Sequence, residues 1–159
     1  NTSTAYWNDA GPVTSGNYTF TVGNSDETNK SGDDFIAYVW AEIPGYSKFG
    51  SYTGNSSTDG PYIYTGFSPS YVMIKRTDAD DEWVIVDSTR SPNNPTKNYL
   101  AANYPDAERT TGTQVELDWA SNGFKVIVSH ARVNVGTYIY AAFAAHPFGG
   151  SGVGQARAR

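Results

Sequence analysis

The loop between residues 52 and 64 holds the side chains of this chain that are best suited to binding chemistry. It carries Tyr52, Asn55, Asp59, Tyr62 and Tyr64. Tyrosine combines a flat apolar ring with a hydroxyl, which suits stacking on a sugar as well as packing in a protein interface. The short polar side chains between the rings can bond sugar hydroxyls. Because loops on a rigid scaffold usually carry recognition, we predict that these five residues bind a ligand, with a glycan as its class.

A second interpretation of this loop stays open. The chain has 12 Tyr, 7 Phe and 4 Trp, while leucine occurs only at positions 100 and 117. Some of the aromatic rings must therefore fill the core. We expect rings at alternate strand positions to be buried and rings in loops to form contact surface. In this second interpretation the 52–64 loop contacts a neighbouring subunit or only solvent.

The acidic turn at residues 78–82 is a weak candidate for a metal site. Asp78, Asp80 and Asp81 supply the oxygen ligands that Ca²⁺ prefers. A full Ca²⁺ loop places ligands at alternate positions and ends in a bidentate Glu after a Gly, and this turn does not have that framework. The pattern favours an exposed, charged hairpin tip. The two histidines, His130 and His146, form no closely spaced ligand pair.

The sequence predicts a protein that is not an enzyme and needs no cofactor. It contains no cysteine, and no Gly-x-Ser-x-Gly elbow precedes a helix. Asp87, Glu116 and Asp118 are carboxylates of the kind that cleave glycosides, but that reaction needs two of them facing each other at a set distance. Sequence does not provide that distance, so a carbohydrate-active enzyme is the least favoured alternative.

Charge is unevenly distributed along the chain. The net charge is -5, and residues 1–44 hold one lysine and six acids, while the remainder holds ten bases and ten acids. A nucleic-acid-binding protein would show a basic patch, so we expect no nucleic-acid partner. No apolar run approaches the roughly 18 residues of a membrane span, so we expect no membrane insertion.

Short apolar segments separated by turn residues predict an all-β fold without a clear helix. The clearest hairpin joins 71–76 to 83–87 across the acidic turn. Eight to ten such strands suit a β-sandwich of jelly-roll or concanavalin-like type. The other expected strands are 17–22, 35–42, 51–54, 62–65, 99–103, 116–119, 124–128 and 137–143.

An internal repeat refines this fold prediction. Residues 35–44, Phe-Ile-Ala-Tyr-Val-Trp-Ala-Glu-Ile-Pro, align with 138–147, Tyr-Ile-Tyr-Ala-Ala-Phe-Ala-Ala-His-Pro. Two copies are too few for a solenoid, so we expect one sandwich with an equivalent hairpin at each end of the chain. Strands 35–42 and 137–144 should then lie centrally and side by side. Trp40 and Phe143 should be equivalent core residues.

The domain organisation follows from composition. Residues 1–16 are polar and interrupted by Gly and Pro, which predicts an extended N-terminal arm anchored by Tyr6 and Trp7. Residues 17–148 form the predicted β-sandwich domain. Residues 149–159 are rich in Gly and predict a flexible C-terminal tail.

Several long motifs resemble a family of known phage proteins. The motifs are Pro-Gly-Tyr-Ser-Lys-Phe-Gly-Ser-Tyr-Thr-Gly-Asn at 44–55, Gly-Phe-Ser-Pro-Ser-Tyr-Val-Met-Ile-Lys-Arg-Thr at 66–77, Trp-Val-Ile-Val-Asp-Ser-Thr-Arg at 83–90, Ser-Asn-Gly-Phe at 121–124 and Thr-Tyr-Ile-Tyr-Ala-Ala-Phe-Ala at 137–144. Together they resemble a C-terminal domain of unknown function in structural and tail-fibre-like proteins of marine and cyanobacterial phages. That domain often lies beside concanavalin A-like lectin modules.

The resemblance implies a role in the virion and supplies no catalytic residue. We therefore expect a non-enzymatic structural protein on the outside of a phage particle, in a fibre, spike or capsid decoration. Its expected partners are other virion proteins and further copies of itself, with a trimer favoured. A glycan-binding adhesin module that contacts the host surface is the alternative, and both roles fit in one protein.

Overall fold

The computed structural model describes residues 22, 26–110 and 112–147. The chain divides into two compact units, residues 1–40 and residues 41–159. Every strand of the described residues lies in the second unit, which we call the sheet unit. The predicted arm at 1–16, almost all of the predicted strand at 17–22 and the tail at 149–159 lie outside the described residues.

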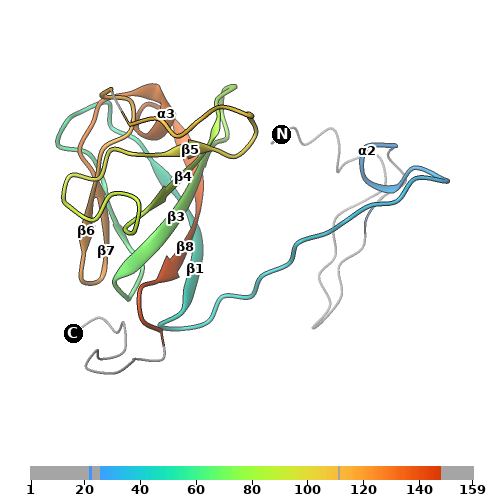
Figure 1. Ribbon diagram of the computed structural model, residues 1–159, viewed down its shortest axis with the longest axis horizontal. Helices are drawn as coiled ribbons and strands as arrows, with labels where there is room; N and C mark the ends of the chain where they lie inside the picture. The colour runs from blue at the N-terminus through green and yellow to red at the C-terminus, as the bar shows by residue number, and fades with distance from the viewer. Residues whose placement is uncertain (1–21, 23–25, 111, 148–159) are drawn as a thin grey trace. The chain divides into compact units, whose positions relative to one another are not determined.

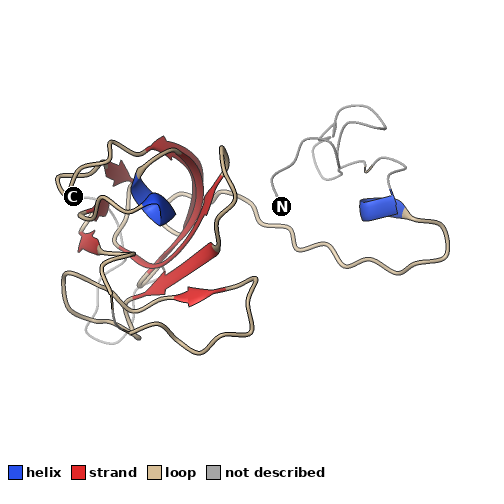
Figure 2. Cartoon of the chain, turned by 90° about the horizontal axis from the view of Figure 1, so that it is seen from above, coloured by secondary structure: helices blue, strands red, loops and turns tan. Residues whose placement is uncertain are grey.

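The sheet unit is built from two antiparallel sheets (Figures 1 and 2). The larger has the order β1-β8-β3-β4-β5, and the smaller has the order β2-β7-β6. The strands are β1 (Ser47–Thr53), β2 (Tyr62–Tyr64), β3 (Pro69–Arg76), β4 (Trp83–Asp87), β5 (Leu100–Ala101), β6 (Leu117–Ala120), β7 (Gly123–Val126) and β8 (Thr137–Ala144). The protein is an all-β sandwich, as its sequence predicts.

The core lies between the two sheets. Inward positions alternate along the strands, as the period of two in a half-buried strand requires. Phe124 of β7 packs edge-on against Tyr140 of β8, with ring centroids 5.7 Å apart, and so joins the small sheet to the large one. Among the described residues, the largest fully buried side chains are Tyr138, Phe67, Phe124, Ile74, Leu117, Val72, Val84, Val86, Val115, Val126, Val133 and Asn134.

The predicted hairpins of the middle and C-terminal parts are confirmed. β3 pairs with β4 in a register that places Val72 opposite Val86 and Ile74 opposite Val84. β6 pairs with β7 through a turn at Ser121 and Asn122. In both hairpins the turn residues interrupt an alternating apolar pattern, so the sequence defines both the strands and their ends.

The prediction of a central strand at 35–42 is wrong. In the structure these residues form no strand, and Trp40 is 57% exposed. β8 lies between β1 and β3 instead. Seven consecutive apolar residues, 35–41, show that a segment can pair in a sheet, but they do not say with which strand. The equivalent hairpins expected at the two chain ends are therefore not present among the described residues.

Phe143 is the second correction from the repeat. It is partly buried on the outer face of β8, whereas Tyr138, Tyr140 and Ala142 point into the core. Its ring lies 5.9 Å from Phe49 and 5.8 Å from Tyr71. Phe143 therefore belongs to an aromatic cluster on the outside of the large sheet.

Helix is restricted to two single turns in the described residues, α2 (Asp26–Asn29) and α3 (Ala131–Asn134) (Figure 2). His130 precedes α3, and its ring nitrogen Nδ1 accepts a hydrogen bond from the backbone N–H of Arg132 at 3.2 Å. Such a cap satisfies a donor that the first turn leaves unpaired. Within the described part of the chain, neither helix has the length or apolarity that a bilayer crossing requires.

Candidate functional site

Two tyrosines of β2 form the most exposed aromatic pair of the sheet unit. Tyr62 is 47% exposed and Tyr64 is 60% exposed, while Ile63 between them is buried in the core. This alternation follows from the strand geometry, because residues two apart share a face and lie about 6.6 Å apart. The outer face of the small sheet therefore presents two tyrosine rings side by side. We call Tyr62, Tyr64 and the polar residues beside them, described next, the β2 face.

The Tyr62 side chain lies close to Gly123 of β7. A Cβ added to Gly123 would lie 2.2 Å from the carbonyl oxygen of Ile63 and 2.8 Å from the Tyr62 hydroxyl oxygen, so only glycine leaves room for the neighbouring strand and the ring. The Tyr62 hydroxyl donates a hydrogen bond to Oδ1 of Asn122. Partial burial raises the pKa of Tyr62, and the nearby hydroxyl group of Tyr64 adds a smaller increase. The bond to Asn122 and the contact with Gly123 thus hold the Tyr62 ring, which stays 47% exposed.

An ion pair borders the tyrosines. Lys125 lies opposite Tyr62 in the β2–β7 register, and its ammonium group pairs with the carboxylate of Asp59. The hydrogen bond from Lys125 lowers the pKa of Asp59. The Asp59 side chain is 85% exposed, so the pair presents one donor and one acceptor group to solvent. With Asn122, these groups surround the rings with hydrogen-bonding partners.

Asn55 shapes the loop that carries Asp59. Its side-chain amide donates to the carbonyl oxygen of Asp59 at 2.8 Å, and its Oδ1 accepts from the N–H of Ser57 at 3.0 Å. These bonds close a compact polar turn of the kind that asparagine favours. Both side-chain groups of Asn55 are therefore engaged within the loop. Its role in the β2 face is to position Asp59.

Asn134 anchors the same loop and was not singled out from the sequence as a site residue. It is fully buried in α3, where its Nδ2 donates to the carbonyls of Ser57 at 2.6 Å and Val128 at 2.7 Å. Its Oδ1 accepts from the N–H of Asn55 at 2.8 Å. An asparagine between Val133 and Val135 is the sequence signal for such an anchor, since buried polar groups need partners.

Tyr52 does not belong to the β2 face. It lies on β1, where its ring stacks on Tyr138 at 4.9 Å and meets Phe124 edge-on at 6.5 Å. Its hydroxyl donates to the carbonyl oxygen of Val133 at 2.7 Å. Burial, with a smaller contribution from Tyr138, raises the pKa of Tyr52 well above its usual range. The inward position of Tyr52 places it with the core, so the prediction of a loop ligand at this residue is corrected.

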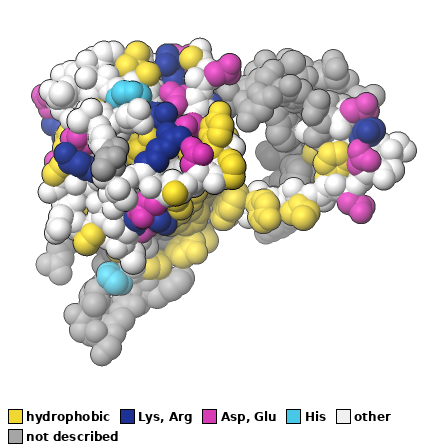
Figure 3. All heavy atoms as spheres, turned by 45° about the horizontal axis from the view of Figure 1, so that its top comes forward, with side chains coloured by type: hydrophobic (Ala, Val, Ile, Leu, Met, Phe, Trp, Pro, Cys, Tyr) yellow, Lys and Arg dark blue, Asp and Glu magenta, His cyan; other side chains and the backbone are white. Residues whose placement is uncertain are grey.

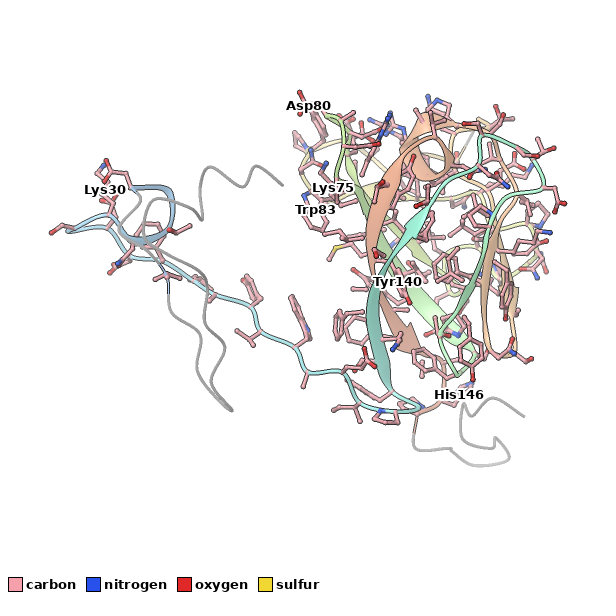
Figure 4. All side chains as sticks on the ribbon, turned by 180° about the vertical axis from the view of Figure 1, so that it is seen from behind. Lys30, Lys75, Asp80, Trp83, Tyr140 and His146 are labelled. Atoms are coloured by element: carbon pink, nitrogen blue, oxygen red, sulfur yellow. The ribbon has the colours of Figure 1, made fainter. Side chains whose placement is uncertain are left out.

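The aspartates of the β3–β4 turn lie in or beside contacts that stabilise the turn. Asp78 pairs with Nε of Arg76 at 2.7 Å, and its other oxygen accepts from the N–H of Thr137 at 3.2 Å. Asp81 accepts from the N–H of Glu82 at 2.8 Å, and Asp80 is exposed at the tip of the turn (Figure 4). Across residues 26–110 and 112–147, no three metal-ligating side chains cluster to hold an ion.

Of the three carboxylates considered for glycoside cleavage, Asp87 and Glu116 have basic partners. Asp87 pairs with Nε of Arg90 at 2.9 Å, and Glu116 pairs with Lys97 at 3.1 Å. A hollow of about 400 Å³ beside the 54–60 loop is lined in part by Glu116 and His130. His130 is the cap of α3 and Glu116 pairs with Lys97, so both side chains already have partners.

A charged cluster at the start of β4 was not predicted from the sequence. Glu82 is 9% exposed and pairs with Arg109 at 2.9 Å and with Arg132. Both guanidinium groups lie 5.6 Å from the ring centre of Tyr99, and this ring is buried. Figure 3 shows basic and acidic side chains side by side on the sheet unit. The cluster joins three distant segments and has a structural role.

Comparison with known proteins identifies the family of this chain. The family model described as "Domain of unknown function (DUF7483)" matches residues 1–147. The chain belongs to this family. The match spans both compact units, so residues 1–40 are part of the family's domain as well as the sheets. No curated protein and no solved structure matches the chain.

Proposed function

We propose that this chain is a non-enzymatic binding module on the surface of a phage particle, where the β2 face contacts a host glycan. The particle assignment rests on the motifs at 44–55, 66–77, 83–90 and 137–144, which resemble phage structural proteins. The glycan assignment rests on the β2 face. The two parts are separable, because the chain can be a particle component with or without a glycan ligand.

The observation that carries the glycan proposal is the exposed pair Tyr62 and Tyr64 on a rigid strand. Aromatic rings stack on the apolar faces of sugar rings, and Tyr62 is already held by Asn122 and Gly123, so little conformational entropy is lost on binding. Asn122, Asp59 and Lys125 lie within the same face and supply donors and acceptors for sugar hydroxyls.

A glycan array with purified protein tests the ligand class. We expect binding to a subset of neutral bacterial-surface glycans, because the polar groups of the face carry one acid and one base. Tyr62→Ala and Tyr64→Ala should each reduce binding at least tenfold. Tyr104→Ala is the matched control, since Tyr104 is 53% exposed in a loop away from β2 and should bind like the parent.

Two results would reject the glycan proposal. One is the absence of binding by the folded parent protein across the array. The other is an equal loss for all three tyrosine variants, which would indicate non-specific contact. The particle proposal is tested separately by mass spectrometry and immunogold labelling of purified phage particles, and absence of the chain from such particles contradicts it.

A further inference from the structure

The hollow beside the 54–60 loop takes no part in the proposed function. Its volume of about 400 Å³ lies in the range of roughly 300–1,000 Å³ that is usual for ligand pockets. Ile127 supplies apolar surface to its wall, and Glu116, Ser129 and His130 supply polar groups. Ligand pockets combine apolar walls with a few polar groups that orient the ligand, and this hollow has both.

The hollow adjoins the β2 face on the outer side of the small sheet. Lys125 of the β2 face and Ile127 in the wall of the hollow are both partly exposed, while the residue between them is fully buried. The N–H of Ile127 donates to the carbonyl oxygen of Glu116 at 3.0 Å, which continues the β6–β7 ladder one step past the strands. Residues two apart on such a ladder share a face and lie about 6.6 Å apart. Asp59 of the β2 face likewise follows Thr58 of the hollow, so the two regions meet along the strand and along the loop.

The polar groups of the hollow keep hydrogen-bonding capacity beyond their partners within the chain. Lys97 bonds Oε1 of Glu116 at 3.1 Å, and a carboxylate has a second oxygen with further acceptor sites. Nδ1 of His130 accepts from the N–H of Arg132, which places the proton of the neutral ring on Nε2 as a donor. The hydroxyl of the exposed Ser129 both donates and accepts. The hollow therefore offers the mixture of acceptors and donors that neighbouring hydroxyls of a sugar require.

We propose that the hollow is a second subsite of the β2 face, so that the ligand is an oligosaccharide of two or more neutral sugar units. One unit stacks on Tyr62 or Tyr64, and a following unit enters the hollow, where its hydroxyls bond Glu116 and His130. Lys97 balances the charge of Glu116, which favours a hydroxylated unit over a charged one. A linked pair of units binds both regions in one association, whereas a single sugar contacts only one of them. This inference rests on the proposed glycan function and adds the length of its ligand.

Titration of the full chain with a length series tests the subsite. The probes are fragments of one to four sugar units, cut from the neutral glycan that binds most tightly on the array, and calorimetry gives the Kd of each. We expect the Kd to fall at least tenfold between one unit and three units, because the longer fragment reaches the hollow. Glu116→Gln should remove most of this gain, since it takes away the charge of the acceptor in the hollow.

Lys97→Ala is the matched control for Glu116→Gln. It breaks the same ion pair but keeps the carboxylate, and Lys97 lies outside the wall of the hollow, so the gain with length should persist. Ser129→Trp is an independent test, because a large ring at this exposed position fills the hollow and should abolish the gain. An equal loss for Lys97→Ala and Glu116→Gln would assign the effect to the ion pair and would contradict the subsite.

The possible results separate the subsite from the glycan function. A Kd that depends on Tyr62 and Tyr64 but not on fragment length would overturn the subsite and leave the glycan function standing. A gain with length that survives both Glu116→Gln and Ser129→Trp would also overturn the subsite, because the additional units would then bind elsewhere. Absence of binding by every fragment and by the intact glycans of the array would reject the glycan function and the subsite together.

Discussion

The backbone N–H of Asn55 donates a hydrogen bond of 2.8 Å to Oδ1 of Asn134, across 79 positions of sequence. This bond joins the polar loop that carries Asp59 to the single turn of α3. The side-chain amide of Asn134 completes the junction with its bonds to Ser57 and Val128. One fully buried side chain therefore positions an element of the β2 face.

Asn134→Ala should destabilise the fold and loosen the 54–60 loop. It removes three hydrogen bonds and leaves their partners unpaired, at about 1 kcal/mol for each bond, so the free energy of unfolding should fall by about 3 kcal/mol. Urea unfolding measures this change. Asn93→Ala, at an exposed position, is the control and should stay within about 0.5 kcal/mol of the parent. Equal stability of the two variants would contradict the anchor role.

Alanine variants of Tyr52 and Tyr64 should differ in stability, because Tyr52 packs against the core and Tyr64 is exposed. Tyr52→Ala removes a ring stacked on Tyr138 and should cost about 3–5 kcal/mol of unfolding free energy, as other large-to-small core changes do. Tyr64→Ala removes an exposed ring and should cost about 1 kcal/mol or less. Thermal and urea unfolding compare the stability that the two variants lose. A larger loss of unfolding free energy for Tyr64→Ala than for Tyr52→Ala would contradict the assignment of Tyr52 to the core.

Much of the fold was predictable because its strands are defined locally. β3 and β4 flank a charged turn, and β6 and β7 flank Ser121 and Asn122, so apolar alternation and turn residues mark each hairpin. Residues 35–42 satisfied the same criteria and form no strand. A strand also needs an edge with which to pair, and that requirement is set by contacts far apart in sequence.

The candidate site was predictable only in part. Tyr62, Tyr64 and Asp59 lie together on one face, as expected from their types, whereas Tyr52 turns inward. The expected strand at 51–54 is the end of a longer strand, β1, which pairs with β8 and places Tyr52 opposite the buried Tyr138. The roles of Asn122 and Gly123 beside Tyr62 depend on the β2–β7 register, for which the sequence holds no local signal.

Alkaline pH should destabilise the protein through Tyr52. Burial raises the pKa of Tyr52 in the folded state, while a tyrosine of the unfolded chain has its ordinary pKa of about 10. Its stabilising contribution is therefore fully present below about pH 10 and is lost as pH rises toward the folded pKa. Urea unfolding at a series of pH values from 8 to 11 should show this decline. Tyr52→Phe should make the decline shallower, and an unchanged slope would contradict the assignment.

The cluster around Glu82 should be sensitive to loss of its charge. Glu82→Gln leaves Arg109 and Arg132 without the carboxylate that they share, and breaking a buried pair of this kind costs roughly 3 kcal/mol. The exposed pair of Lys97 with Glu116 is the control, and Lys97→Ala should cost less than about 1 kcal/mol. Chemical unfolding at constant ionic strength compares the two. Similar losses would show that the cluster contributes no more than a surface ion pair.

Backbone-amide chemical-shift mapping with a glycan identified on the array tests the central claim most directly. The account predicts shifts concentrated at Tyr62, Tyr64, Asn122, Gly123 and Lys125, with saturation at rising glycan concentration and no such shifts in Tyr62→Ala. Shifts confined to another surface of the sheet unit, or none in the folded parent, would contradict glycan recognition by the β2 face.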